Sequence, residues 1–472
     1  MTKKTRFFLF IIFVFLFFLI APAVVLYSQG WRFDFQTKHF TKTGAFFFKV
    51  TPKTVQIYLN DKLTKKTDFL SGTAYIENLL PKNYKVTITK TDYFIWEKTL
   101  EIKEQKPTEA KNVVLIPAKV NFNLLAKGIE EFFPSSDGKK IILKKKTKEG
   151  WSLSLFDLNK NVQSLLIEKS GELLDLKTSE DFTKLILQIS ANEDVGYYIL
   201  DLGKETNNLI PLDFLGKEIE SISFNPQDNQ KLFFISSQVK NNVGGENKTL
   251  AKKNSLYEAN YSNKEIRGPL LSNIVSYEIF NNTFYYIEDT GILYKTGLSI
   301  DSKDRMNNEP FQIQNETEYK LIQVNSEIFL KEDSKLYSFN KEGKFFEKLF
   351  EPFKELKASQ DLNKMVYFSD NEIWVLFLKE TLEQPERKIG DRLFITRFSE
   401  KVGNVFWLTD YYLVFNAGDS IKIAEIDERD KIQIWNIVNF KDSKIFYNYK
   451  SDPRSLYILS NSNLYSSESL VP

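Results

Sequence analysis

Residues 136–143, Ser-Asp-Gly-Lys-Lys-Ile-Ile-Leu, join a tight turn to the start of an apolar strand. Glycine takes left-handed backbone conformations at no steric cost, and an Asp side chain hydrogen-bonds backbone amides next to it, so both favour turns. The β-branched and apolar residues that follow favour a buried strand. The stretch therefore predicts one corner of a β structure, and its recurrence along the chain predicts the fold.

The same order of Asp turn, basic or amide residue and apolar strand returns several times after residue 119. The further copies are residues 180–187, 227–234, 360–367 and 451–458, and copies without the Asp turn lie at 283–287, 328–330 and 412–415. Each is followed by another strand. A period of about 40 to 45 residues with four strands is typical of a β-propeller blade. We predict about eight blades over residues 119–472, with seven as the alternative.

The ends of this region predict how the ring closes. The last unit, residues 444–469, has room for only three strands, and Val120–Leu125 could supply the fourth. Ring closure removes an exposed sheet edge, which is otherwise a site of aggregation. A β-solenoid or two stacked sandwiches is the alternative. Long helices are not expected after Tyr27, because no sustained 3.6-residue apolar period follows it.

The copy at Ser136–Leu143 resembles the blades of TolB-like and WD40-like propellers, in which Pro-Asp-Gly-Lys occupies the turn. This resemblance implies the fold and says nothing about a ligand.

Residues 43–117 are predicted to form a small antiparallel β module. Tyr84–Thr89 alternates Tyr, Val and Ile with Lys and Thr, which indicates a strand with one buried face. Asn60-Asp61-Lys62 is a turn between two short strands. The predicted strands are Ala45–Val50, Val55–Leu59, Ala74–Ile76, Tyr84–Thr89, Leu100–Ile102 and Val113–Ile116.

This module resembles the PEGA domain, a small β-sandwich-like unit of bacterial and archaeal surface proteins. The shared features are Thr43-Gly44, Val50-Thr51-Pro52, Asn60-Asp61-Lys62, Leu79–Val86, Asp92-Tyr93, Trp96-Glu97-Lys98 and Leu115-Ile116-Pro117. Pro52-Lys53-Thr54-Val55 stands where the family has Pro-Glu-Gly-Ala, and Asn83 and Asp92 replace glycines. Asn and Asp tolerate left-handed backbone conformations best among non-glycine residues. The resemblance implies a surface or interaction module without catalytic residues.

Phe7–Tyr27 is a run of 21 residues without a charge. A bilayer core needs about 20 apolar residues in helical geometry, so the run is long enough to cross it. Lys3, Lys4 and Arg6 precede the run, which predicts an N-terminus in the cytoplasm and the bulk of the chain outside it.

A cleaved secretory signal is the competing interpretation of the N-terminus. Ala21-Pro22-Ala23 loosely matches an A-x-A cleavage site. The apolar run continues beyond that site, however, and Trp31 and Phe33 follow it, as in the aromatic belt of a retained anchor.

Composition excludes several kinds of chemistry. The chain has no cysteine, so thiol catalysis, thiolate metal sites and disulfides are absent, and its only histidine is His39. A Ser-His-Asp triad or a multi-histidine metal site is therefore not expected. The 64 Lys and Arg balance 62 Asp and Glu, so no strong field exists to recruit nucleic acid.

Four sets of residues are candidate sites, and each also has a structural interpretation. Asp137, Asp181, Asp228, Asp361 and Asp452 recur at equivalent places, but an Asp in a tight turn more often shapes the hairpin, and no D-x-D-x-D-G calcium loop exists. Trp151, Trp374, Trp407 and Trp435 are candidate sugar platforms or core residues between blades. Asp301, Asp304 and Glu309, with Asn307 and Asn308, form either a cation site or a solvated loop. Val239–Asn254 is either a recognition loop or a variable blade connection.

The predicted chain is all-β after its helix. It comprises a cytoplasmic tail (1–6), a transmembrane helix (7–27), a spacer (28–42), a PEGA-like β-sandwich (43–117) and the propeller (119–472). No catalytic, cofactor or metal residue is predicted. The expected role is a single-pass protein of the bacterial cytoplasmic membrane that recognises envelope protein or glycan through propeller loops. The alternatives are a carbohydrate-active enzyme of the envelope, which keeps the question of catalysis open, and a purely structural tether.

Overall fold

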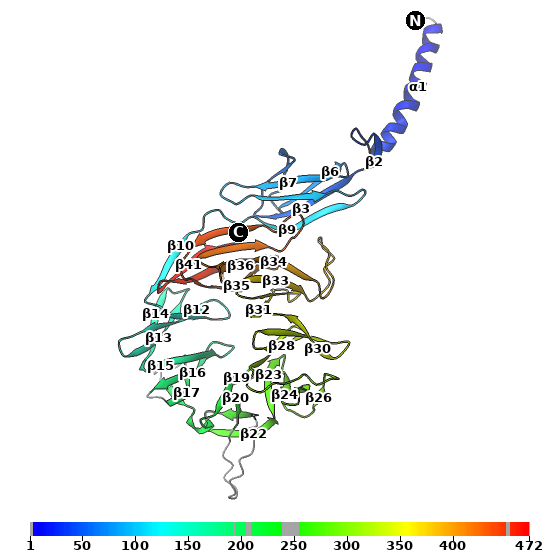
Figure 1. The fold of residues 1–472 in the computed structure, drawn as a ribbon. Coiled ribbons are helices and arrows are strands. Elements are labelled where there is room, and N and C mark those ends of the chain that lie inside the picture. The colour runs from blue at the N-terminus through cyan, green and yellow to red at the C-terminus, as the bar shows by residue number, and fades with distance from the viewer. Residues whose placement is uncertain (1–2, 192–193, 204–208, 238–253, 450–453, 472) are drawn as a thin grey trace.

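The computed structural model describes residues 3–191, 194–203, 209–237, 254–449 and 454–471. The chain begins with helix α1 (Lys3–Ser28), which projects from a body built of strands (Figure 1). α1 begins four residues before the predicted apolar run and ends one residue after it. An 18-residue window of the helix has a mean hydropathy of 3.2 and none of the helix residues is buried, so α1 is long and apolar enough to span a membrane. A signal sequence has the same properties.

The predicted spacer contains a small antiparallel hairpin. Its strands are β1 (Trp31–Asp34) and β2 (His39–Lys42), which pair from Trp31 with Lys42 to Asp34 with His39. Lys38 in the turn has a φ of 59°.

Two sheets pack face to face after the hairpin and form a sandwich. One sheet has the order β6 (Thr73–Leu79), β3 (Gly44–Thr51), β9 (Pro107–Val114). The other has the order β5 (Lys62–Lys66), β4 (Gln56–Leu59), β7 (Asn83–Thr89), β8 (Trp96–Glu101). Phe46 and Phe48 of the first sheet are fully buried against Ile57, Val86 and Ile88 of the second.

The prediction of an antiparallel module is wrong for one pair of strands. β9 runs parallel to β3, with Phe46 opposite Thr108 and Thr51 opposite Val114. The chain leaves β8 in one sheet and crosses to the other before β9 begins, so β9 arrives beside β3 in the same direction. At the two positions where Asn and Asp replace glycines, only Asp92 takes a positive φ, 67°.

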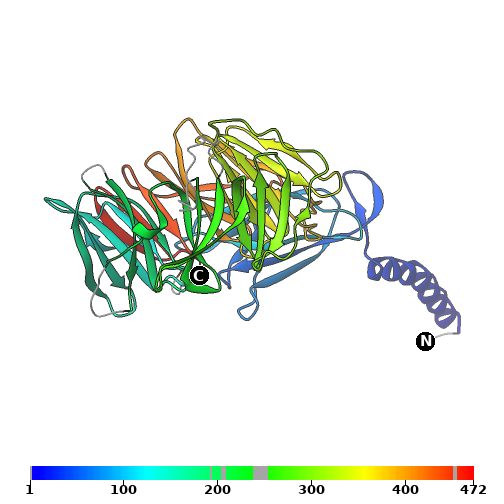
Figure 2. The same ribbon diagram turned by 90° about the horizontal axis from the view of Figure 1, so that it is seen from below.

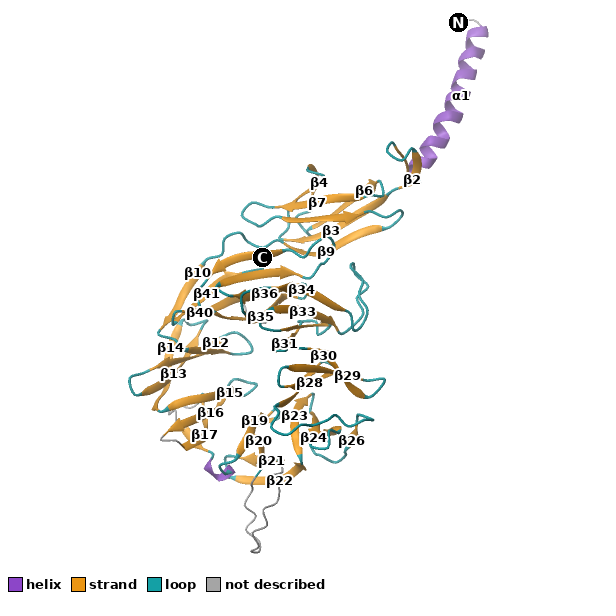
Figure 3. Cartoon of the chain, in the orientation of Figure 1, coloured by secondary structure: helices purple, strands orange, loops and turns teal. Residues whose placement is uncertain are grey.

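Eight four-stranded antiparallel sheets follow in the described residues, and Figures 1 and 3 show them arranged in a ring. The first blade holds β11 (Glu131–Pro134), β12 (Lys140–Lys146), β13 (Gly150–Asp157) and β14 (Val162–Ser170), and the second holds β15 (Glu172–Thr178), β16 (Lys184–Ala191), β17 (Asp194–Asp201) and β18 (Leu209–Pro211). The short helix η1 (Asp213–Leu215) follows the second blade. The third blade holds β19 (Ile219–Asn225), β20 (Asp228–Ser236), β21 (Ser255–Asn260) and β22 (Glu265–Ser272), and the fourth holds β23 (Ile274–Phe280), β24 (Thr283–Glu288), β25 (Leu293–Gly297) and β26 (Asp304–Arg305).

The next three blades hold β27 (Tyr319–Val324), β28 (Glu327–Glu332), β29 (Lys335–Asn340) and β30 (Phe345–Phe350); β31 (Glu355–Ala358), β32 (Lys364–Phe368), β33 (Glu372–Phe377) and β34 (Arg392–Arg397); and β35 (Val402–Thr409), β36 (Tyr412–Ala417), β37 (Ser420–Glu425) and β38 (Ile434–Asn439). All eight predicted repeats fall on the second strand of a blade: β12, β16, β20, β24, β28, β32, β36 and β40 (Ser455–Ser460). The propeller with eight blades is thus confirmed in the described residues.

The closing blade joins the two ends of the ring, as predicted. Its order is β10 (Phe122–Lys127), β41 (Asn463–Ser469), β40 and β39 (Lys444–Tyr447). β10 lies two residues later than the predicted Val120–Leu125 and pairs with β41 from Phe122 opposite Ser467 to Lys127 opposite Asn463. The last strand of the chain therefore lies between strands from both ends of the propeller.

The sandwich and the propeller share one hydrophobic core. Phe46, Val86 and Leu115 of the sandwich belong to the same buried cluster as Tyr412 and Ile458 of the propeller. Seen from below, the sandwich lies directly against the ring, and α1 extends away from both (Figure 2). Because apolar burial is the main stabilising contribution in a folded chain, this shared core joins the two units into one body.

Candidate functional site

The junction between sandwich and propeller begins with the alternation of β8. In Trp-Glu-Lys-Thr-Leu-Glu, residues Trp96, Lys98 and Leu100 point to one face of the strand, and all three are buried. Lys98 has no solvent exposure. A lysine is almost never fully buried unless its charge is paired, so its surroundings must supply partners.

The propeller supplies an ion pair and three hydrogen bonds to the Lys98 ammonium. Nζ lies 2.6 Å from Oε1 of Glu425, which is itself only 3 % exposed. The same Nζ donates to three carbonyl oxygens of the β37–β38 loop, those of Asp427 at 2.8 Å, Arg429 at 3.0 Å and Lys431 at 2.6 Å. A cation of the sandwich is thus enclosed by acceptors of the propeller.

Glu425 is held from both sides of the junction. Its Oε2 accepts a hydrogen bond from Nε1 of Trp96 at 2.9 Å, and its Oε1 accepts one from the backbone N–H of Gln433 at 3.1 Å. Burial raises the pKa of the Glu425 carboxyl to about 7, and the charge of Lys98 opposes that rise. The carboxylate therefore depends on Lys98 for its charged state.

Residues 378–391 of the propeller connect β33 to β34 and are called the strap. The strap contacts β9, which is an edge strand of the sandwich. The side chain of Gln384 accepts from the backbone N–H of Glu109 at 3.0 Å and donates to the carbonyl of Pro107 at 3.1 Å. Oε2 of Glu383 accepts from Nδ2 of Asn112 at 3.1 Å and from the hydroxyl of Tyr411 at 3.1 Å. These bonds clamp β9 against the ring.

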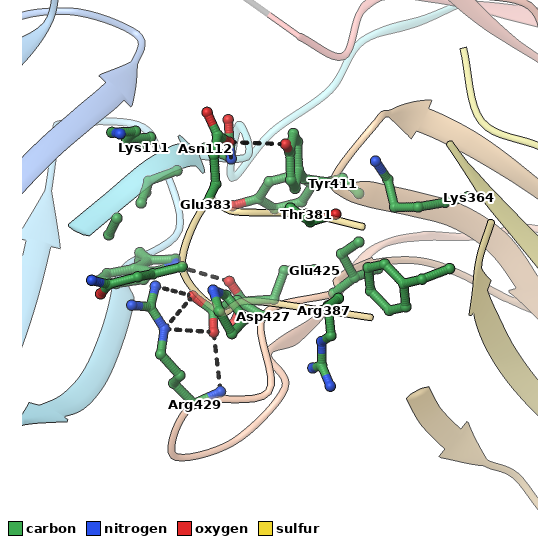
Figure 4. Close-up of a pocket in the computed structure, with 18 residues that line it drawn as sticks. Lys111, Asn112, Lys364, Thr381, Glu383, Arg387, Tyr411, Glu425, Asp427 and Arg429 are labelled. Atoms are coloured by element: carbon green, nitrogen blue, oxygen red, sulfur yellow. Dashed lines mark hydrogen bonds and ion pairs between the residues drawn. The ribbon is translucent and has the colours of Figure 1, made fainter. Parts of the chain in front are cut away.

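A small cavity of about 50 Å³ remains inside this junction (Figure 4). Its walls come from β8, β9, the strap and the β37–β38 loop, and they include Asn112, Glu383, Tyr411 and the ion pair of Arg429 with Asp427. A water needs roughly 10–15 Å³ of such space, so the cavity has room for a few waters and not for an organic ligand. The junction is therefore a packed joint between the two units.

A larger hollow, here called the channel, lies in the propeller. A cavity of about 1190 Å³ is bordered by the first strands of three successive blades, β19, β23 and β27. Lys177 and Lys320 lie on its wall, and the hydroxyl of Tyr277 lies 3.0 Å from that of Ser223. Burial raises the pKa of Glu278, and Lys320 opposes the rise. The channel is polar and holds charges of both signs.

No protein family and no curated protein matches the chain. Solved structures similar to it include Sqt1 of Saccharomyces cerevisiae, with a TM-score of 0.45 and 8 % identity over 75 % of this chain and 98 % of that one. The β-propeller domain of Cps50 (Swd1) of Myceliophteria thermophila has a TM-score of 0.42 and 9 % identity over 74 % and 99 %. An oligogalacturonate lyase of Vibrio parahaemolyticus has a TM-score of 0.38 and 13 % identity over 67 % and 96 %.

The recurring Asp residues hydrogen-bond the turns in which they lie. Oδ1 of Asp137 accepts from the backbone N–H of Lys139 at 3.0 Å, and Oδ1 of Asp228 accepts from that of Gln230 at 3.0 Å. Asp181 and Asp361 accept from Thr183 and Asn363 in the same way. These contacts agree with a structural role, in which each Asp side chain shapes its turn. Asp452 lies outside the described residues.

The four tryptophans lie in or against the packed interior of the blades. Trp151, Trp407 and Trp435 are buried, and Trp407 donates its Nε1–H to the carbonyl of Lys357 in the neighbouring blade at 2.9 Å. Trp374 is half-buried and stacks on Tyr367. These positions agree with core residues between blades and not with platforms open to a sugar.

The polar stretch around Asp301 is organised by an amide. Asn307 is buried, accepts from the backbone N–H of Leu293 at 2.9 Å and donates to the carbonyls of Gly291 and Glu309. Asp301, Asp304 and Glu309 are exposed. No group of three or more potential metal-binding side chains occurs within the described ranges. The candidate loop Val239–Asn254 lies, apart from Asn254, outside those ranges.

Sequence reasoning missed the residues that build the junction. Lys98 entered only as part of a family resemblance, and Glu425, Glu383 and Gln384 were not singled out. One local signal was available, because Lys98 occupies a position where the alternation of β8 calls for an apolar residue. A charged residue on a buried face indicates a paired charge, although it does not identify the partner.

Proposed function

We propose that this chain is a membrane-anchored binding or scaffolding protein of the bacterial cell envelope, which presents its propeller outside the cytoplasmic membrane. In this proposal α1 is retained as a single-pass anchor with its N-terminus inside, residues 43–117 are a PEGA-like module, and residues 119–472 recognise protein or glycan. The observation that carries it is the joint at Lys98, since a buried interdomain ion pair and a shared core fix the propeller on the unit next to α1.

The direction of presentation supports the same role. Strands β8 and β9, which bond the propeller, are the edge strands on one side of the sandwich, and β5 and β6 are the edges on the other side. α1 and the propeller leave the sandwich on opposite sides (Figure 1). A mount of this kind holds the ring away from the bilayer, with its central channel available to a partner.

Neither an enzyme nor a bare tether is favoured by a specific observation. Glycosidases generally use two carboxyl groups about 5 to 10 Å apart. Among the channel carboxyls, burial raises the pKa of Glu278, and no specific observation pairs it with a second catalytic carboxyl in the described residues. A bare tether needs no channel with charged walls.

Membrane fractions test the proposed function directly. After an alkaline carbonate wash, the full chain is expected to stay in the membrane pellet, and mild detergent is expected to release it together with a protein or glycan partner. Lys177→Glu with Lys320→Glu alters the channel wall and should reduce that recovery, whereas the exposed Lys217→Glu should not. Release by carbonate would contradict the anchor. If no partner is found in pull-downs or on a glycan array, the binding role is contradicted and a purely structural tether is the interpretation that remains.

A further inference from the structure

The side of the sandwich opposite the propeller carries large apolar side chains on ordered backbone. The β5–β6 loop holds Phe69 and Leu70 at its tip, 74 % and 72 % exposed. Asp68 fixes this loop: its Oδ1 accepts from the backbone N–H groups of Leu70 and Ser71, and its Oδ2 accepts from that of Thr73 at 2.9 Å. A fixed loop that keeps two apolar side chains in solvent indicates a contact surface.

Lysines line the strand that leads into this tip. Strand β5, Lys-Leu-Thr-Lys-Lys, is exposed at every position and carries Lys62, Lys65 and Lys66 without an acidic residue. Among the acidic groups nearby, the Asp68 carboxylate is held in hydrogen bonds within the loop, Asp61 is paired with Lys85, at 3.3 Å, and Glu77 is exposed on β6. Lysines on an edge strand also prevent pairing between copies of a chain. That role leaves the exposed Phe69 and Leu70 unexplained, because apolar exposure promotes association.

The same side is continuous with the end of α1. The β1–β2 hairpin follows the helix directly and gathers three rings, with Phe33 5.2 Å from Phe35 and 5.2 Å from Phe40 between ring centroids. Nη2 of Arg32 bonds Oδ1 of Asn78 at 2.7 Å, which ties the hairpin to one end of β6. Phe69 and Leu70 lie at the other end of β6, and Nζ of Lys65 bonds the carbonyl of Tyr75 between them.

We propose that this β5–β6 side, from the hairpin rings to Phe69 and Leu70, is a lipid-binding surface that lies on an anionic bilayer. The aromatic and apolar side chains enter the headgroup layer, and the β5 lysines contact lipid phosphates. The inference rests on the proposed function, because it needs α1 to remain in the membrane. Its consequence is a fixed orientation of the sandwich and propeller on the membrane. With α1 as the sole contact they could rotate and tilt about the anchor, whereas a second contact with the bilayer prevents both motions.

The test uses the full chain in nanodiscs of neutral or anionic lipid. Since the chain has no cysteine, single cysteines can carry an environment-sensitive fluorophore. A label at Leu70→Cys is expected to shift to the blue in anionic discs and to be quenched by nitroxide lipids labelled near the headgroup. A label at Phe15→Cys in α1 should be quenched by deeply labelled lipids, and one at Leu382→Cys on the strap should not be quenched.

Charge-reversal variants test whether the β5 lysines themselves contact the lipid or whether the total charge of the chain is what matters. Each lysine near an anionic surface contributes about a fivefold change in partition. Lys62→Glu with Lys65→Glu and Lys66→Glu should therefore lower the fraction of chains whose β5–β6 side contacts the lipid by more than about tenfold. The matched Lys139→Glu with Lys160→Glu and Lys217→Glu, on exposed lysines of the propeller, should leave it unchanged.

Three outcomes would overturn the inference or its basis. An unquenched Leu70 label beside a quenched Phe15 label would refute the lipid surface and leave the anchor intact. An unquenched Phe15 label would refute the anchor itself. Quenching at Leu70 that requires two copies in one disc would identify self-association through β5 in place of lipid binding.

Discussion

Lys98→Met is expected to weaken the docking of the sandwich on the propeller by about 3–5 kcal/mol. Methionine keeps the volume of the side chain but removes its charge, and Glu425 would stay buried, 3 % exposed, without a cation. The carbonyls of Asp427, Arg429 and Lys431 would lose their donor as well. Removing one partner of a buried pair costs far more than the intact pair contributes.

Hydrogen exchange on β8 measures this loss at the joint itself. The backbone N–H of Glu97 donates to Oε1 of Gln433 at 3.2 Å, and that of Thr99 donates to Oδ2 of Asp430 at 2.8 Å, so both report docking. Their protection is expected to fall about a hundredfold or more in Lys98→Met. Adding Glu425→Gln should restore part of it, because Gln carries no charge and its single Oε1 can still accept from either Trp96 or Gln433.

An exposed pair provides the matched control. Lys217 lies 3.2 Å from Asp194, with both side chains at least 85 % exposed. Lys217→Met makes the same chemical change and should cost less than about 1 kcal/mol, because solvent screens such pairs. Equal β8 protection in Lys98→Met and Lys217→Met would show that the buried pair does not hold the joint.

Leu464→Ala is expected to destabilise the propeller by about 2–5 kcal/mol. Leu464 lies on β41, is fully buried, and packs in one cluster with Ile129 of the β10–β11 connection and Ile141 of the neighbouring blade. The substitution removes apolar contacts and opens a cavity where the first and last blades meet. The midpoint of denaturant unfolding measures the effect.

Leu382→Ala is the control for ring closure. Leu382 is 81 % exposed on the strap, and the same Leu-to-Ala change there should alter stability by no more than about 0.5 kcal/mol. If both substitutions shift the midpoint equally, β41 does not close the ring.

Local patterns predicted the propeller because each blade repeats them. An apolar strand like Ile141 to Leu143, preceded in five copies by an Asp turn, recurs about every 40 to 45 residues, and every copy falls on a second strand of a blade. Strand β5 was missed because Lys-Leu-Thr-Lys-Lys is an exposed edge without alternation. β9 was predicted only from Val113 onward, because its first residues, Pro-Thr-Glu-Ala-Lys-Asn, are largely polar.

The junction could not be predicted from local patterns. Lys98 meets Glu425 across more than three hundred residues of chain, and periodicity describes only which face of a strand is buried. Gln384 and Glu383 lie on a strap whose residues form neither a helix nor a regular sheet edge. Their partners follow from how two folded units dock, which depends on the complete surfaces of both.

Whether the sandwich holds the propeller in one orientation can be measured by the distance between two spin labels. In the cysteine-free chain, Thr64→Cys on β5 and Val162→Cys on β14 place one exposed label on each unit. For the full chain in a bilayer we predict a single narrow distance distribution, which broadens in Lys98→Met. A broad distribution in the unsubstituted background would contradict a rigid joint and with it the proposed presentation of the propeller.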